Sequence, residues 1–293
     1  MKHALREWAG IRKVLRRRTI LLFLDFDGTL APIVSIPAKA CLPPGARELL
    51  KRLSLQSEIR LIVISGRDID DVRKRVAVPG AVYVGSHGCR ISGHEINWDH
   101  VFPVAYRSKL RRLFREVSVA MKDICGVHIE SKDLSVAVHY RNVRNRDLPV
   151  FFDRMERISA PYIASSCIKK TEGKKVVEFC MATTWNKGRA VKWLLRSMKG
   201  AKCPAPCMPL YIGDDKTDEH AFEALKGKGV SIHVGTGKQT AAGYRLKNTA
   251  EVLAFLWNIY TFGLADLPLV GPKQVHGCIQ GLSTNRTWPV LYP

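Results

Sequence analysis

The sequence predicts an α/β fold in which a parallel sheet carries a smaller α+β domain as an insertion. Short apolar runs at residues 20–24 and 59–64 have the length of strands that are buried on both faces. Each run is followed by a loop and then by a segment with helical spacing of apolar residues, and this alternation is typical of a parallel sheet. After about residue 100 the predicted elements include strands with alternating apolar residues that are joined by short turns, which indicates antiparallel pairing.

The predicted elements follow in order along the chain. Residues 2–18 hold seven basic side chains and one acid, and their apolar residues recur at helical spacing, so we expect an amphipathic helix that lies on the domain or on a membrane surface. The core is expected to have strands at 20–24, 59–64, 81–84, 209–212 and 230–234, and helices at 43–55, 68–76, 186–198, 218–225 and 250–260. The insertion is expected to have helices at 106–122 and 149–158 and strands at 127–130, 135–140, 168–170 and 176–179.

These elements divide the chain into four parts. A basic helix at 1–18 precedes a discontinuous core of residues 19–99 and 181–262. Residues 100–180 form the inserted α+β domain, and 263–293 form a tail rich in Pro, Gly and polar residues. The run at 19–24 is too short for a secretory signal, and residues 252–270 carry polar side chains and a proline, so we expect no transmembrane segment.

Composition leaves several functions open. The 293 residues are 46% hydrophobic and 25% charged, as in ordinary globular proteins. The net charge of +21 would attract nucleic acid, acidic lipid or phosphorylated metabolites, or could simply be a basic surface. No nucleic-acid motif or run of stacking aromatics accompanies this charge. The eight cysteines are scattered, which suggests reduced thiols in a cytoplasmic protein.

The strongest chemical signal is the segment Asp25-Phe26-Asp27-Gly28-Thr29, directly after the first buried run. Two carboxylates two residues apart at a strand end can point into one site. One can attack phosphorus to give an aspartyl-phosphate, and the other can protonate the leaving alcohol and then deprotonate water. Gly28 permits a sharp turn, and Thr29 offers a hydroxyl to phosphate.

Two further signals follow other predicted strands or open a helix. Ser65, followed by Gly66 and Arg67, offers a hydroxyl and backbone N–H groups at a helix start, which suits an anion or a simple helix cap. Lys187 lies near the start of the 186–198 helix, where a cation is mildly unfavourable unless it faces phosphate and a carboxylate. The alternative for Lys187 is an ordinary solvated side chain.

The fourth signal is Gly213-Asp214-Asp215-Lys216-Thr217-Asp218-Glu219, after the strand at 209–212. So many acids in one turn would repel one another without a cation, and oxygen ligands suit Mg²⁺. Asp25, the Asp27 carbonyl and Asp214 would form part of its shell. An acidic helix cap would explain Asp218 and Glu219 but would not explain the preceding pair, Asp214 and Asp215. In a parallel sheet all four signals meet at the carboxyl edge of the strands.

In this order, the four motifs resemble those of the haloacid-dehalogenase-like phosphatases, over residues 20–262. The resemblance implies a Rossmann-like core, Asp25 as nucleophile, Asp27 as acid and base, and Ser65 and Lys187 on the phosphate. It also places Asp214 on Mg²⁺, with support from the other acids of the fourth motif, Asp215 and Asp218.

Further segments are similar to those of the trehalose-6-phosphate phosphatases. They are Leu30-Ala31-Pro32-Ile33-Val34, Gly85-Ser86-His87-Gly88, Glu130-Ser131-Lys132, residues 135–141 and Gly173-Lys174-Lys175-Val176-Val177-Glu178. The resemblance implies phosphate or sugar contacts from His87, Gly88, Glu130, Lys132, Arg141, Lys174 and Glu178. Carboxylates that accept hydrogen bonds from sugar hydroxyls can reject wrong sugars.

The expected function is therefore hydrolysis of trehalose 6-phosphate in trehalose biosynthesis, with a sugar phosphate as the small-molecule partner. The alternatives are a phosphatase for sucrose phosphate or glucosylglycerol phosphate, and a basic protein that binds nucleic acid or a membrane surface. Because the chain has no synthase domain, a trehalose-6-phosphate synthase partner would be a separate protein.

Overall fold

The computed structural model forms two compact units, each described by itself. The described residues are 1–93, 96–101, 104–131, 134–165, 168–173, 175–198, 206–237 and 239–262. The first unit comprises Met1–Asp99 and the chain from Trp185 onward, and the second is His100–Thr184. The insertion expected at 100–180 therefore corresponds to the second unit.

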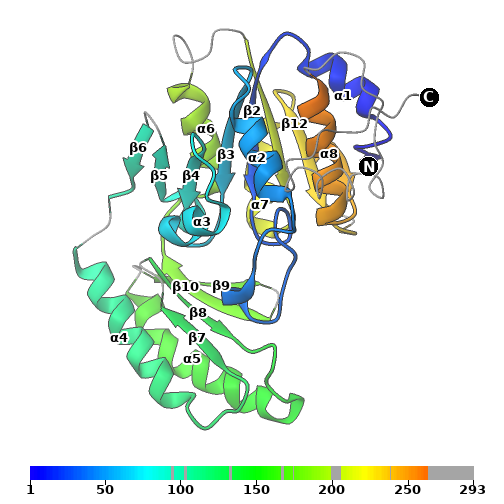
Figure 1. Ribbon diagram of the computed structural model, residues 1–293. Helices are drawn as coiled ribbons and strands as arrows, with labels where there is room; N and C mark the ends of the chain where they lie inside the picture. Colours follow the sequence, from blue (N-terminus) through cyan, green and yellow to red (C-terminus); the bar gives the residue numbers. More distant parts are fainter. Residues whose placement is uncertain are drawn as a thin grey trace. The chain divides into compact units, whose positions relative to one another are not determined.

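The first unit is built on a large, mostly parallel sheet (Figure 1). Within the described residues the strand order is β1-β13-β12-β11-β2-β3-β4-β5-β6. The strands are β1 (Lys2–His3), β2 (Thr19–Asp25), β3 (Ile59–Ile64), β4 (Val82–Gly85), β5 (Arg90–Gly93), β6 (Ile96–Asp99), β11 (Cys207–Gly213), β12 (Val230–Val234) and β13 (Tyr244–Leu246). The pairs from β1 to β4 are parallel, whereas β5 pairs antiparallel with both of its neighbours.

Helices cover both faces of this sheet, which explains the unbroken apolar runs in its strands. One face packs against α1 (Trp8–Leu15), α2 (Ala46–Ser54), α3 (Ile69–Val76) and α8 (Thr249–Phe262), and the other against α6 (Lys187–Ser197) and α7 (Lys216–Leu225). In β2, Leu22 and Leu24 join the first core and Leu21 and Phe23 the second. Short 3₁₀ turns, η1 (Pro37–Lys39) and η2 (Ser86–Gly88), follow β2 and β4.

The second unit is a four-stranded antiparallel sheet with two helices (Figure 1). Its strand order is β7 (His128–Ser131), β8 (Ser135–His139), β10 (Val176–Met181) and β9 (Ile168–Gly173). The helices α4 (Val104–Ala120) and α5 (Leu148–Ala164) pack on it, and η3 (Asn145–Asp147) leads into α5. In β10 the alternate residues Val177 and Phe179 are fully buried, and they pair with the buried Val138 and Val136 of β8. The opposite face carries the polar side chains.

The amino-terminal segment differs from its expected form. The helix spans only Trp8–Leu15, and β1 before it pairs with β13 at the edge of the sheet. Trp8, Ile11 and Leu15 are buried in the core of the first unit. Because the apolar face of α1 is used inside the protein, it is not available to a membrane surface. The described helices include none with the length and apolar character of a membrane span.

Other differences are local. The hairpin of β5 and β6 was not expected, because each strand is four residues long and only partly apolar. Helix α5 runs past its expected end at 158 to Ala164 and contains Pro161. The described cysteines Cys41, Cys89, Cys125, Cys180 and Cys207 are free thiols, as the scattered spacing predicts.

Candidate active site

The centre of the site is an ion pair between Asp25 and Lys187, which are 162 positions apart in the sequence. Asp25 ends β2 and is 4% exposed. Lys187 is the first residue of α6 and is 2% exposed. Its Nζ donates to Asp25 Oδ1 at 2.7 Å and to Asp218 Oδ1 at 2.7 Å. The alternative of a solvated Lys187 is therefore wrong, and its charge is directed at two buried carboxylates.

Asp218 is the anchor of this arrangement. It is fully buried on α7, and Tyr211 of β11 donates its hydroxyl to the same Oδ1 at 2.6 Å. The other oxygen, Oδ2, accepts from the backbone N–H of Asp215 at 2.9 Å, as part of a capping box at the start of α7. Both oxygens of Asp218 are thus occupied by protein donors. It supports the site by holding Lys187.

Burial and these neighbours shift several pKa values. Burial lowers the pKa of Lys187, but the carboxylates of Asp218 and Asp25 outweigh it, so the pKa is raised and the ammonium stays charged. Burial raises the pKa of Asp25 well above its usual range; Lys187 opposes this, and the Asp218 and Asp214 carboxylates add to it. Burial and the adjacent Asp218 likewise raise the pKa of Tyr211, which therefore remains a hydrogen-bond donor.

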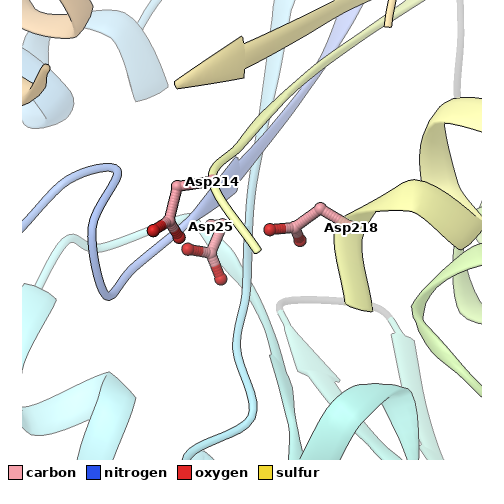
Figure 2. A group of neighbouring side chains, drawn as sticks. All are labelled: Asp25, Asp214 and Asp218. Atoms are coloured by element: carbon pink, nitrogen blue, oxygen red, sulfur yellow. The ribbon is translucent and has the colours of Figure 1, made fainter. Parts of the chain in front are cut away.

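The charges at the site suit a divalent cation. The carboxylates of Asp25, Asp214 and Asp218 have oxygen atoms that all lie within 4.8 Å of one another, and Figure 2 shows them converging from β2, the end of β11 and α7. Three carboxylates and the Lys187 ammonium leave a formal charge of −2. Mg²⁺ would balance this charge and prefers such oxygen ligands. Since both oxygens of Asp218 already accept hydrogen bonds from protein donors, we expect Asp25 and Asp214 to bind the ion.

Gly28 makes the approach of Asp214 possible. Its φ is +87°, and a Cβ at this position would lie 2.2 Å from Asp214 Oδ2. Any side chain at position 28 would therefore displace the Asp214 carboxylate, besides straining the backbone. The Gly in the first motif thus has a second role, which is to leave room for the acid of the fourth motif.

The loops after β3 and β4 contact each other, and the first of them begins at Ser65, next to Ile64, the residue of β3 that pairs with Asp25. Ser65 is 1% exposed, and its Oγ accepts from the backbone N–H of Arg67 at 3.0 Å, which is a helix-cap type of contact. The backbone N–H of His87 donates to Ser65 O, which joins the two loops. The His87 ring packs on Gly66, where a Cβ would lie 2.5 Å from Cε1. Gly88 likewise packs closely on α6, against Ala190 Cβ.

Thr29 follows Gly28 in the first loop and is completely buried. Among the described residues, its hydroxyl has no hydrogen-bond partner. A buried hydroxyl without a partner is costly, so a ligand oxygen at this position would satisfy it. This observation is consistent with the expected role of Thr29 toward phosphate.

Asp27 and Arg67 make a pair that the motifs did not predict. Arg67 Nε lies 2.7 Å from Asp27 Oδ2, and Nη2 lies 2.7 Å from Oδ1, so the guanidinium holds both carboxylate oxygens. Arg67 also contacts Asp71 Oδ2 at 2.9 Å and the carbonyl of Pro37 at 2.8 Å. We expected Arg67 to bind substrate, whereas its side chain is engaged by protein oxygens.

The second unit brings together the two acids predicted to read a sugar. Glu130 of β7 and Glu178 of β10 both lie opposite Ala137 of β8, so they share the sheet face that does not pack on helices. Ser135 Oγ donates to Glu178 Oε1 at 2.7 Å, and His139 Nε2 lies 3.3 Å from Glu130 Oε2. The exposed Arg141 follows β8 two residues after its end. Lys132 and Lys174 lie outside the described residues.

Tyr211 is a site residue that the sequence reasoning missed. The available signal was its position within an apolar strand, because a buried tyrosine hydroxyl needs a partner. The acids that follow β11 were candidates for that partner. Which acid it contacts depends on the turn between β11 and α7, and the sequence alone does not determine this geometry.

Comparison with known proteins identifies the family of the chain. The family described as trehalose-phosphatase matches residues 23–250, which is most of the chain. The chain belongs to the trehalose-phosphatase family. It is 33% identical over 277 residues to a probable trehalose-phosphate phosphatase of Oryza sativa subsp. japonica, an alignment that covers 86% of this chain and 71% of the rice protein.

Members of the trehalose-phosphatase family also share the fold. The structure of the C-terminal domain of trehalose-6-phosphate phosphatase from C. albicans superposes with a TM-score of 0.73 and 25% identity, covering 87% of this chain and 96% of that one. The predicted haloacid-dehalogenase-like core with an inserted α+β domain is thereby confirmed. An uncharacterized glycosyl hydrolase of Mycobacterium tuberculosis is 36% identical over 259 residues, but this alignment covers 86% of this chain and only 19% of the mycobacterial protein.

Proposed function

We propose that the chain hydrolyses trehalose 6-phosphate to trehalose and phosphate through a phosphoryl group carried on Asp25. The observation that carries the proposal is the placement of Asp25. Its carboxylate ends a buried strand, touches the Lys187 ammonium at 2.7 Å and lies beside Asp214. A buried carboxylate held by a cation and facing a second acid suits a nucleophile better than a structural ion pair.

In the first step, Asp25 attacks phosphorus and the bond to the sugar oxygen breaks. The Lys187 ammonium offsets the negative charge on the transferring group and on its attacker. The hydroxyls of Ser65 and Thr29 hold phosphate oxygens, together with backbone N–H groups of the loop that follows β3. Asp27 gives its proton to the sugar oxygen as that oxygen leaves, which avoids the release of an alkoxide.

In the second step, a water attacks the phosphorus of the aspartyl-phosphate. Asp27, now a carboxylate, takes a proton from this water, and the bond from phosphorus to the Asp25 oxygen breaks. Phosphate leaves, and both carboxyl groups return to their starting states. The proton count balances, because the proton that Asp27 gave to the sugar is recovered from water.

Asp25 and Asp214 would hold Mg²⁺, with the backbone carbonyl of Asp27 as a further expected ligand and Asp215 and Asp218 as support. The ion would supply positive charge to the phosphate oxygens when bound. The −2 charge of the site and the closeness of its carboxylates support this choice.

The sheet face of the second unit that carries Glu130 and Glu178 is proposed to read the sugar. Glu130 and Glu178 would accept hydrogen bonds from sugar hydroxyls, and Arg141, Lys132 and Lys174 would hold hydroxyls or the phosphate. In the first unit, His87 and Gly88 are proposed to contact the phosphate. A site that pairs each substrate hydroxyl can reject other sugars, because an unpaired buried group costs about 1–3 kcal/mol.

The test is phosphate release from trehalose 6-phosphate by the purified protein, after chelation and with Mg²⁺ restored. We expect turnover only with Mg²⁺, and none from Asp25→Asn. The control variant is Asp153→Asn, because it makes the same chemical change at an exposed residue of the second unit that belongs to none of the motifs, and it should retain full turnover. Turnover by Asp25→Asn would reject the mechanism.

A panel of sugar phosphates tests the substrate. We expect trehalose 6-phosphate to be hydrolysed faster than sucrose 6-phosphate or glucosylglycerol phosphate, and Glu130→Gln and Glu178→Gln to erase that preference. Glu172→Gln is the matched control, because Glu172 lies on the same sheet opposite Val177, a residue of the helix-packed face. Equal rates on all substrates by the wild type would contradict selection by this sheet.

A cytoplasmic location and a separate synthase partner remain predictions.

A further inference from the structure

We propose that Arg67 is a positioning residue that holds the Asp27 carboxylate in place for proton transfer. This inference rests on the proposed function, in which Asp27 is the acid and base. The role differs from substrate binding, which the Ser65-Gly66-Arg67 motif suggested. It follows from where the five N–H donors of the Arg67 guanidinium are directed.

The contact between Arg67 and Asp27 is a two-point fork. Nε and Nη2 approach the two carboxylate oxygens at 2.7 Å each, which fixes the plane of the carboxylate as well as its position. The Asp27 side chain is 41% exposed, while that of Arg67 is 11% exposed. Asp27 would therefore turn freely in solvent if the fork were absent, and a misplaced acid loses much of its effect.

Arg67 is itself held from several directions. Asp71, one turn along α3, accepts from Nη1 at 2.9 Å, and the Pro37 carbonyl accepts from Nη2 at 2.8 Å. The guanidinium also lies over the Phe26 ring, 5.5 Å from its centroid. These contacts join the loop after β2 to the first turns of α3, so that Asp27 is fixed to a rigid element and not only to its own loop.

The fork also defines how Asp27 must act. Its two oxygens are both occupied by Arg67, so one oxygen has to exchange its contact for the sugar oxygen while the other stays on the guanidinium. The proton then moves from the freed oxygen to the sugar oxygen as the bond to phosphorus breaks. After the attack of water the proton returns to the same oxygen, so that Asp27 is again an acid held by the guanidinium through its other oxygen. Arg67 neither gives nor takes a proton in this cycle.

Leaving-group dependence distinguishes positioning of an acid from general support of the fold. Trehalose 6-phosphate has an alkyl leaving group that needs a proton, whereas p-nitrophenyl phosphate releases a stable anion that does not. The quantity to measure is kcat/KM on each ester, because it reports the steps up to phosphoryl transfer. The ratio of the two values isolates the contribution of the acid.

The variants are Arg67→Gln and Arg67→Lys, with Arg75→Gln as the matched control. Arg75 lies on α3, contacts the same Asp71 at 2.8 Å, and donates to the carbonyl of Ala40 in the same loop, and these hydrogen bonds do not involve Asp27. Loss of Arg75 therefore reproduces the structural effect of losing Arg67 without touching the acid. Arg67→Lys keeps the charge but cannot form the fork.

We expect Arg67→Gln to lower kcat/KM on trehalose 6-phosphate about tenfold more than on p-nitrophenyl phosphate, which is part of what a positioned acid contributes. Arg67→Lys should fall in the same direction, and Arg75→Gln should affect both esters equally. The double variant Asp27→Asn/Arg67→Gln should have the same ratio of kcat/KM on the two esters as Asp27→Asn alone.

Equal losses on both esters from Arg67→Gln, or a ratio that matches the one from Arg75→Gln, would overturn the inference. If Arg67→Gln does not fold, Arg67→Lys decides on the same criterion. If the wild type hydrolyses only a different alkyl phosphate, the substrate in the proposed function is wrong, and the ratio is measured with that alkyl ester. The two failures are therefore separable.

Discussion

Tyr211→Phe removes one atom from the network beneath the nucleophile. The Tyr211 hydroxyl donates to Asp218 Oδ1 at 2.6 Å, and Asp218 is fully buried, so water cannot replace the lost donor. A hydrogen bond to a charged group contributes about 1.5–3 kcal/mol. Phe keeps the packing against Phe23 and Phe222. We therefore expect the free energy of unfolding of the first unit to fall by about 1.5–3 kcal/mol, with reduced phosphatase activity.

Urea unfolding followed by tryptophan fluorescence measures this loss. All six tryptophans of the chain fall outside residues 100–184, so their emission reports the first unit alone. Tyr83→Phe is the control, because the Tyr83 hydroxyl bonds to the backbone of Val78 and to none of the described site residues. It should lower stability and leave activity unchanged. A Tyr211→Phe protein with wild-type stability and activity would refute the role of Asp218 as anchor.

Three further predictions concern the same centre. Lys187→Met should lower the free energy of unfolding by about 3–5 kcal/mol in chelator, because it leaves Asp25 and Asp218 buried without their cation; a loss near zero would contradict the buried ion pair. Gly28→Ala should raise the Mg²⁺ concentration needed for half-maximal activity about tenfold, since its Cβ displaces Asp214; an unchanged requirement would reject Asp214 as a ligand. The pKa of Asp25 is raised in the folded protein, so the folded state binds a proton more tightly than the unfolded chain does. The free energy of unfolding in chelator should therefore fall as the pH rises above 3.8, the ordinary pKa of an Asp side chain, and through the raised pKa. Mg²⁺ should oppose that fall, and urea midpoints measured against pH with and without the ion would show it.

Much of the fold was predictable because its signals are local. The apolar run of β2 predicts a buried strand, and the two-aspartate motif follows it directly. The strand and the position of Asp25 at its carboxyl end could therefore both be predicted. Lys187 could be placed for a related reason, since a cation at a helix start needs an anion to face. In each case one short segment carried both the structure and the chemistry.

The parts that could not be predicted depend on pairing across long separations. Arg67 and Asp27 are 40 positions apart in the sequence. The sequence alone is equally compatible with a guanidinium that binds the substrate phosphate. Several acids follow Tyr211 in the turn after β11, and the sequence does not show that Asp218 is the one that accepts its hydroxyl hydrogen bond. The short strands β5 and β6 have too few apolar residues to stand out, and they form because β4 offers an edge to pair with.

The proposed mechanism requires that Asp25 carries the phosphoryl group. Mixing the protein with trehalose 6-phosphate and Mg²⁺, quenching in acid within the first turnover and mapping the peptides by mass spectrometry tests it directly. We expect one added phosphoryl group on the peptide that contains Asp25, and none in Asp25→Asn. Phosphate release at the normal rate with no labelled peptide, or with the label on another residue, would contradict it.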